Sequence, residues 1–96
     1  MTRSAIQIEI RSAPDAGKRF VFDHGPITFG RADANVLTIG HRYASRKHGE
    51  IQFADGYWRL TVLGYNTTTV NGRKVRGQSR QLNDQDLVAI GNEPLF

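Results

Sequence analysis

Hydrophobic and polar residues alternate along most of this chain, and the period is two residues rather than the 3.6 of a helix. The apolar members of the four clearest runs are Ile6, Ile8 and Ile10; Phe20 and Phe22; Ile51 and Phe53; and Trp58, Leu60 and Val62. A period of two is typical of β-strands that turn one face towards a core. No window of eleven residues or more carries the spacing of an amphipathic helix.

Turn-forming residues separate these runs, at 14–17, 23–26, 54–56 and 71–72. Asp55-Gly56 and Asn71-Gly72 predict tight hairpins, because both residue types tolerate the positive φ angles of such turns. Many short strands with glycine-rich turns and no helix predict an all-β sandwich or barrel.

The length of 96 residues predicts a single domain over residues 1–96. Its final strand is expected to run from about Leu87 to Phe96, with an interruption at Gly91. The absence of cysteine excludes disulfides and thiolate chemistry and is consistent with a reducing compartment. No apolar run is long enough to span a bilayer, and residues 1–5 lack the apolar region of a signal peptide, so we expect a cytoplasmic protein, or a nuclear one in a eukaryote.

Positive charge is in excess, with 13 Lys and Arg residues against 9 Asp and Glu residues. The net charge of +4 favours an anionic partner, which the charge alone leaves open between nucleic acid, a phosphorylated protein and an acidic membrane. The most crowded stretch of potential anion ligands contains Arg42, Ser45, Arg46, Lys47 and His48. Arg31 directly follows Gly30 at the end of another apolar run. Guanidinium forks beside a hydroxyl group are well suited to a phosphate.

The sequence gives little support to catalysis. Ser45 and His48 are three residues apart, but no third group is evident that would orient the histidine. Asp84 and Asp86 are separated by one residue and are interpreted as part of a polar turn. The three histidines lack the spacing of a metal site, and the glycine-rich nucleotide-binding motifs are absent. We therefore expect no enzyme activity, no metal and no cofactor.

Five landmarks in order resemble the signature of the forkhead-associated (FHA) domain, a family that binds phosphothreonine peptides. They are Gly30-Arg31, Ser45-Arg46-Lys47-His48, Asn66-Thr67-Thr68, Val70-Asn71-Gly72 and the run from Leu82 to Gly91. The resemblance covers about residues 5–96. It implies a β-sandwich of about eleven strands with the ligand site on loops at one end. Loops 31–36 and 40–48 would ordinarily lie at opposite ends of the strand that joins them. Because this strand, about Leu37–Ile39, is short, both loops can still lie at one end of the sandwich, as the resemblance implies.

The resemblance also implies a set of phosphopeptide ligands. Arg31 would pair with the phosphate, Ser45 would donate its hydroxyl to it, and Arg46 would add a further contact. Asn66 would hold the backbone of the peptide. Tyr65 stands at a position that often touches the phosphothreonine in this family.

Other residues of the landmarks receive supporting roles. Gly30 would permit close backbone packing, and His48 would brace the loops from beneath. Asn71 and Gly72 would be structural. Arg42 and Lys47 would belong to a cationic rim.

Several positions depart from the family pattern, among them Tyr65, which stands where the family commonly has Ser or Thr. Gly64 replaces a frequent serine, and Thr67 replaces a glycine, although a β-branched residue resists positive φ. Gln85 replaces the glycine of a Gly-Asp pair. His41-Arg42 lies where the family is often acidic, which makes the rim more cationic.

The function expected from these residues is phosphorylation-dependent binding of a phosphothreonine-containing protein, such as the substrate of a Ser/Thr kinase, by a module that is commonly part of a larger signalling protein. One alternative is an FHA-like scaffold or oligomerisation module that ignores phosphate. Another is a nucleic-acid-binding domain that uses the basic residues Arg42, Arg46, Lys47, Arg73, Lys74 and Arg76. The aromatic residues mostly occupy inward positions, which disfavours stacking on bases.

Overall fold

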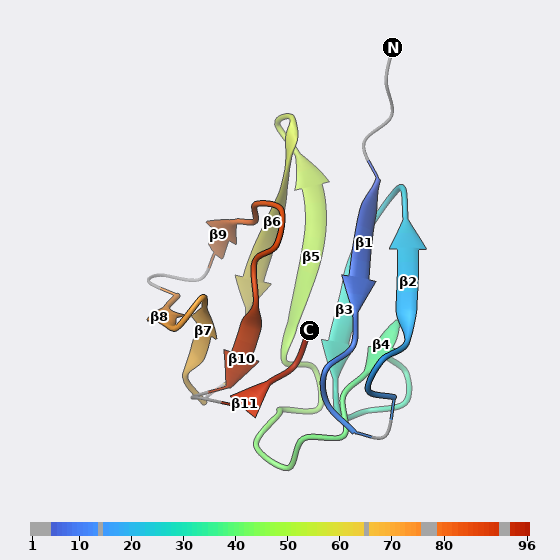
Figure 1. Ribbon diagram of the computed structural model, residues 1–96, viewed down its shortest axis with the longest axis vertical. Helices are drawn as coiled ribbons and strands as arrows, with labels where there is room; N and C mark the ends of the chain where they lie inside the picture. Colours follow the sequence, from blue (N-terminus) through green and yellow to red (C-terminus); the bar gives the residue numbers. More distant parts are fainter. Residues whose placement is uncertain (1–4, 14, 65, 76–78, 91–92) are drawn as a thin grey trace.

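The computed structural model describes residues 5–13, 15–64, 66–75, 79–90 and 93–96. Within those residues we find no helix of the length and hydrophobicity that a membrane span requires. The described residues form eleven strands: β1 (Ile6–Glu9), β2 (Arg19–Phe22), β3 (Ile27–Gly30), β4 (Leu37–Thr38), β5 (Gly49–Ala54), β6 (Tyr57–Val62), β7 (Thr68–Val70), β8 (Arg73–Lys74), β9 (Ser79–Gln81), β10 (Val88–Ile90) and β11 (Glu93–Pro94). The all-β prediction is therefore confirmed (Figure 1).

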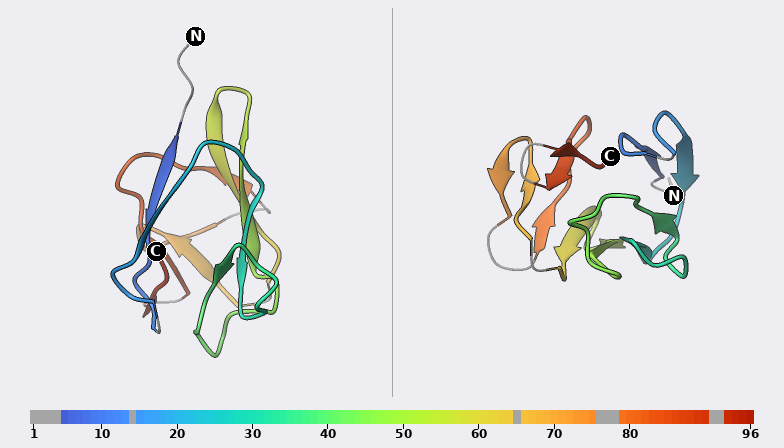
Figure 2. Two further views of the ribbon diagram at one scale, coloured as in Figure 1. Left: turned by 90° about the vertical axis from the view of Figure 1, so that its right-hand side faces the viewer. Right: turned by 90° about the horizontal axis from the view of Figure 1, so that it is seen from below.

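The strands build a sandwich of two layers. One layer is a five-stranded sheet in the order β4-β3-β5-β6-β9. The other layer contains a four-stranded sheet, β11-β10-β7-β8, beside the β1-β2 pair. The end-on view in Figure 2 shows the five-stranded sheet facing these two smaller sheets.

The two predicted hairpins are present. In the β5–β6 hairpin Ala54 pairs with Tyr57, and Asp55 and Gly56 between them have φ angles of 56° and 89°. In the β7–β8 hairpin the turn residues Asn71 and Gly72 have φ angles of 54° and 82°. Positive φ at both central residues is the conformation that matches the twist of antiparallel strands.

The pairing of β3 with β4 determines where the loops lie. Phe29 pairs with Leu37 and Gly30 with Thr38 in parallel, so β3 and β4 end at the same edge of the sandwich. Loop 31–36 follows β3 and doubles back to the start of β4, and loop 40–48 begins where β4 ends. Both loops therefore meet at one end, at the bottom of Figure 1.

The prediction of one final strand from Leu87 to Phe96 is wrong. The chain instead reverses, because β10 and β11 are antiparallel, with Ile90 opposite Glu93. Gly91, where we expected an interruption, lies outside the described residues.

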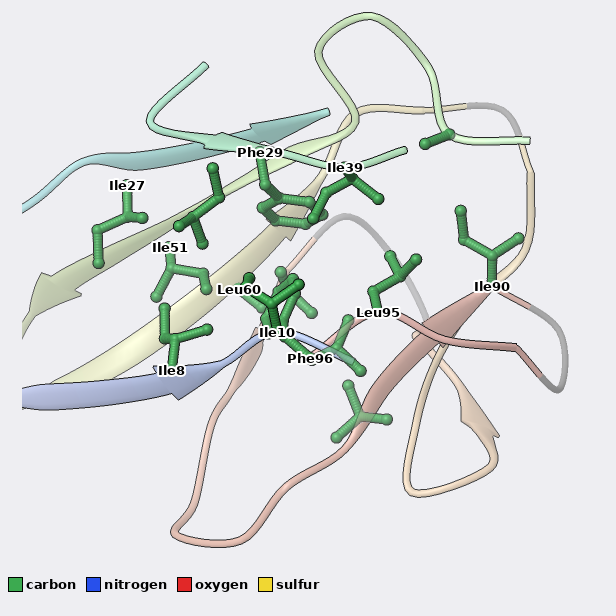
Figure 3. Packing of buried hydrophobic residues seen from close by; sticks show 14 of the residues in the cluster. Ile8, Ile10, Ile27, Phe29, Ile39, Ile51, Leu60, Ile90, Leu95 and Phe96 are labelled. Atoms are coloured by element: carbon green, nitrogen blue, oxygen red, sulfur yellow. The ribbon is translucent and has the colours of Figure 1, made fainter. Parts of the chain in front are cut away.

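The core lies between the two layers and consists of the inward residues of the alternating runs (Figure 3). Phe29 of β3 is fully buried and meets Phe96 edge to face, with ring centroids 5.0 Å apart. The largest other side chains that are nearly fully buried are Ile27, Ile39, Ile51, Leu60, Leu95, His48, Val70 and Val88. At about 25 cal/mol per Å² of apolar surface removed from water, such burial is the main force that holds the layers together and keeps the loop ends in place.

Candidate functional site

Arg31 and the Ser45-Arg46 pair lie side by side where β3 ends. The N–H of Arg31 donates to the carbonyl oxygen of Ser45 at 3.0 Å, and the N–H of Ala32 donates to that of Arg46 at 3.1 Å. These bonds extend the contact of β3 with the segment that leads into β5. The structure thus brings together three of the residues that the sequence singles out as phosphate ligands.

Gly30 is the point where the two segments come closest. A Cβ atom on Gly30 would overlap the carbonyl oxygen of Arg46 and stand 2.8 Å from the backbone nitrogen of His48. These backbone atoms have no room to withdraw, since the N–H of His48 already donates to the carbonyl oxygen of Phe29 at 2.8 Å. A side chain at this position would therefore displace the neighbouring backbone.

The side chain of Arg31 is anchored at one of its donors. Its Nε–H donates to the carbonyl oxygen of Ala44 at 2.6 Å. Arg31 is exposed overall, and its terminal Nη groups make no hydrogen bond to the described residues. A guanidinium held at Nε in this way leaves its two Nη groups, with four N–H donors in one plane, for an external anion.

His48 is fully buried beneath these loops and is bonded at both ring nitrogens. Nδ1 accepts the backbone N–H of Ser45 at 3.0 Å, so the ring proton is on Nε2, which lies 2.8 Å from Oγ1 of Thr68. The hydroxyl of Thr68 donates in turn to the carbonyl oxygen of Asn66 at 3.4 Å. His48 therefore links loop 40–48 to β7, with the contacts expected of an internal brace.

Burial lowers the pKa of His48 below its usual value of 6.5, and the electrostatic interaction with His41 lowers it further. The ring is therefore neutral at pH 7. A neutral ring is needed at this position because protonation of Nδ1 would remove the acceptor that holds the N–H of Ser45.

Asn66 attaches a third loop to loop 40–48. Its Nδ2–H donates to the carbonyl oxygen of Tyr43 at 2.7 Å, and the residue is otherwise exposed. The site therefore draws on loops 31–36, 40–48 and 63–67. Tyr65, which the sequence adds to this group, lies outside the described residues.

Two departures from the family pattern have a structural context in loop 63–67. A Cβ on Gly64 would overlap the ring of His48 and stand 2.8 Å from Oγ of Ser45. The N–H of Gly64 donates to the carbonyl oxygen of His48 at 2.9 Å, which holds the loop against the ring. Thr67 is not among the residues with positive φ, so the backbone avoids the conformation that threonine resists.

The two predicted rim residues differ in their contacts. Arg42 lies over the ring of Tyr43, with its Cζ 4.7 Å from the ring centroid and an Nη2–H donated to the tyrosine hydroxyl at 2.8 Å. Lys47 lies 3.7 Å from a carboxylate oxygen of Glu50. Both side chains are exposed, so each contact is a weak surface interaction.

Two side chains that shape the loops, Asn35 and His41, make contacts that could not be predicted from the sequence. Nδ2 of Asn35 donates to the carbonyl oxygens of Ala32 and Arg46, at 2.8 and 2.6 Å. Nε2 of His41 lies 2.5 Å from a carboxylate oxygen of Glu93 on β11. An asparagine in a polar loop carries no specific signal, and the two members of the second pair are too far apart in sequence to be matched by spacing.

Asn71 and Gly72 lie at the other end of β7 from Asn66. Nδ2 of Asn71 donates to Asp86 at 2.7 Å, and its Oδ1 accepts the N–H of Leu87 at 2.9 Å. Gln85, in the neighbouring turn, has a φ of 69°, a conformation that favours glycine. This cluster supports the turns away from the loop site, in keeping with a structural role for Asn71.

Ser45 and His48 do not form a nucleophile and base. The backbone N–H of Ser45, rather than its hydroxyl, is bonded to the ring, and Nε2 is directed to Thr68. Among the described residues no group of three or more histidine and carboxylate side chains is placed to hold a metal ion.

The fold and the site together define a β-sandwich interaction module with an arginine-bearing loop cluster at one end. The chain belongs to the FHA domain family, whose sequence profile matches residues 27–91. Members of this family are interaction modules rather than enzymes.

Relatives with the same domain occur in Corynebacterium. An oxoglutarate dehydrogenase inhibitor from Corynebacterium diphtheriae is 30% identical over 82 residues, which cover 85% of this chain and 57% of that protein. The protein of the same description from Corynebacterium glutamicum is 29% identical over 77 residues, which cover 79% and 54%. The chain thus spans little more than half the length of these relatives.

Solved FHA domains have a similar fold. One from an Arabidopsis thaliana hypothetical protein is 25% identical and superposes with a TM-score of 0.81 over 95% of this chain and 80% of that one. The N-terminal FHA domain of Rad53p from S. cerevisiae, solved in complex with a phosphothreonine peptide, is 30% identical, with a TM-score of 0.64 over 71% of this chain and 57% of that one.

Proposed function

We propose that this FHA domain binds phosphothreonine-containing segments of partner proteins at the loop cluster formed by Arg31, Ser45, Arg46 and Asn66. The observation that carries the proposal is the convergence of these residues from three loops that hydrogen bonds fasten to one another. The Rad53p domain, which is described with a phosphothreonine peptide, supports the choice of ligand.

The phosphate is received by the guanidinium of Arg31 and the hydroxyl of Ser45. A phosphothreonine carries about −1.5 to −2 charges and three acceptor oxygens at pH 7. The Oγ of Ser45 makes no hydrogen bond to the described residues, and the same holds for the Nη groups of Arg31. Each charge-assisted bond contributes on the order of 1.5–3 kcal/mol, so the two residues together separate measurable from negligible binding.

Arg46 and Asn66 extend the contact beyond the phosphate. The exposed guanidinium of Arg46 adds positive charge beside Ser45. Asn66 uses Nδ2 to hold Tyr43, which leaves its Oδ1 to accept an N–H from the peptide backbone. A contact to the backbone fixes the position of the peptide without selecting its sequence.

The proposed partner is a protein phosphorylated by a Ser/Thr kinase in the cytoplasm. The two Corynebacterium relatives are described as inhibitors of oxoglutarate dehydrogenase, which makes a metabolic enzyme a reasonable class of partner to test. Arg42 and Lys47 would attract the phosphorylated segment electrostatically from the rim.

A peptide library screen tests the proposal. The same sequences are presented with phosphothreonine, phosphoserine and unmodified threonine, and we expect binding only in the phosphorylated sets. Equal binding of unmodified peptides would replace the proposal with a phosphate-independent scaffold. Binding to single-stranded DNA or RNA with a steep salt dependence, and none to phosphopeptides, would replace it with a nucleic-acid-binding domain.

A further inference from the structure

We infer that Glu93 and His41 are positioning residues for the phosphopeptide site. In this account the carboxylate of Glu93, on β11, holds the ring of His41, and the ring holds the turn whose carbonyl groups anchor Arg31 and Asn66. The inference rests on the proposed function and adds two residues outside the proposed set of ligands.

The first link is a hydrogen bond between distant parts of the chain. Nε2 of His41 lies 2.5 Å from Oε2 of Glu93, and Nδ1 of the same ring accepts the N–H of Tyr43 at 3.1 Å. Because Nδ1 is an acceptor, the proton is on Nε2 and is donated to the carboxylate. His41 is buried, with 9% of its surface exposed, whereas the Glu93 side chain is largely exposed, so loss of the carboxylate would leave water as the partner of this donor and nothing to hold the ring in place.

The second link is the turn from His41 to Ala44. The carbonyl oxygen of His41 accepts the N–H of Ala44 at 3.0 Å, and the rings of His41 and Tyr43 lie 5.6 Å apart. His41 is thus bonded to the turn twice, by the backbone N–H of Tyr43 at its ring and by the backbone N–H of Ala44 at its carbonyl oxygen. The conformation of the turn depends directly on where the ring of His41 is held.

The third link joins the turn to the proposed ligands. The carbonyl oxygen of Ala44 accepts Nε–H of Arg31 at 2.6 Å, and the carbonyl oxygen of Tyr43 accepts Nδ2–H of Asn66 at 2.7 Å. A displaced turn would therefore release the phosphate ligand and the backbone ligand together. This is how a residue on β11 influences both.

The direction of the change in phosphopeptide affinity distinguishes a positioning role of Glu93 from a purely electrostatic one. A carboxylate near a phosphate site repels the ligand, so by Coulomb's law alone the removal of Glu93 would tighten binding. If Glu93 instead positions the loop, its removal weakens binding. Glu93→Gln removes the charge but keeps an oxygen acceptor for Nε2 of His41, whereas Glu93→Ala removes both.

The experiment compares Glu93→Ala and Glu93→Gln with Asp84→Ala, which removes an exposed carboxylate from another part of the molecule. Calorimetry measures affinity for the best phosphothreonine peptide of the screen. NMR of the ¹⁵N-labelled free protein follows the Arg31 Nε–Hε and Asn66 Nδ2 resonances. We expect Glu93→Ala to weaken affinity about five- to tenfold and to shift both resonances, with Glu93→Gln and Asp84→Ala within about twofold of the wild type.

The inference would be overturned if Glu93→Ala bound the phosphopeptide as tightly as the wild type, or more tightly, with the Arg31 and Asn66 resonances unshifted. It would also be overturned if Glu93→Gln lost as much affinity as Glu93→Ala. The resonances are recorded without any ligand. If the wild type binds no phosphopeptide, the proposed function fails, while the resonances still decide whether Glu93 holds the loop.

Discussion

The backbone N–H of Ser45 donates to Nδ1 of the buried His48 at 3.0 Å. An internal histidine thus determines where a proposed phosphate ligand stands, although the histidine itself is shielded from the ligand. The same ring reaches Thr68 on the opposite layer through Nε2. The loops at this end of the sandwich are therefore held from the core as well as from one another.

The first prediction concerns pH. The pKa of His48 is lowered in the folded state by burial and by His41, while the unfolded chain keeps a value near 6.5. As the pH falls through about 6.5 the unfolded state takes up the proton first, so the stabilisation present above that pH is lost as the pH approaches the folded pKa. We expect urea unfolding to give a smaller free energy at about pH 5.5 than at about pH 7.5.

The exposed His24 provides the control for this titration. His24→Ala should retain the pH dependence that His48 produces, because it leaves the burial and the hydrogen bonds of His48 unchanged. A free energy of unfolding that stays constant over this range would contradict the neutral, buried state of His48.

The second prediction tests the close approach at Gly30. Gly30→Ala places a Cβ against the carbonyl oxygen of Arg46, and we expect a loss of about 1–3 kcal/mol or more in the free energy of unfolding. Thermal or urea unfolding measures this. Gly17→Ala serves for comparison, because open space surrounds Gly17 and only its φ of 95° is unfavourable for alanine. A loss clearly below about 1 kcal/mol in Gly30→Ala would show that packing at Gly30 is not tight.

The third prediction concerns Asn35, which joins loop 31–36 to loop 40–48. Asn35→Ala removes two hydrogen bonds to carbonyl groups, of which the one to Arg46 joins the two loops. One such bond contributes about 0.5–1.5 kcal/mol, so we expect three- to tenfold weaker phosphopeptide binding. Asn83→Ala, at an exposed asparagine near the Asn71–Asp86 cluster, should bind like the wild type in the same fluorescence anisotropy titration. Wild-type affinity in an Asn35→Ala domain would mean that phosphopeptide binding does not need the hydrogen bonds of Asn35.

The fourth prediction separates stability from binding. Asn71→Ala loses the bonds to Asp86 and Leu87 and forces alanine into positive φ, so we expect a cost of about 2–3 kcal/mol in unfolding free energy. Asn71→Gly loses the same bonds but tolerates the φ of 54°, and should cost less. Phosphopeptide affinity of the folded variants should stay at the wild-type value. A matching loss of affinity would mean that the turn belongs to the binding site.

Local chemistry explains which parts of the fold could be predicted. The hairpins at Asp55-Gly56 and Asn71-Gly72 follow from the φ preferences of two adjacent residues, and the buried faces follow from alternation within single strands. The reversal between β10 and β11 was missed because a strand broken at one glycine and a short hairpin look alike in a sequence of ten residues. Such a difference is decided by pairing with other strands.

The meeting of loops 31–36 and 40–48 at one end required tertiary information. It depends on the parallel pairing of Phe29 with Leu37, which no local pattern in the two-residue strand β4 specifies. The bond from His41 to Glu93 is a second example, since both residue types are ordinary in polar loops. For the proposed phosphopeptide site, the landmarks of the FHA resemblance indicated which residues belong to it, and the structure adds the hydrogen bonds that hold these residues in place.

The most direct test of the central claim is the calorimetric affinity of Arg31→Ala for a phosphothreonine peptide that the wild type binds. We expect binding to become undetectable while the domain stays folded, with a loss of no more than about 1.5–3 kcal/mol in the free energy of unfolding from the bond of Nε–H to Ala44. Arg73→Ala, which removes an equally exposed arginine from β8, should bind within about twofold of the wild type. Wild-type affinity in a folded Arg31→Ala domain would contradict the account.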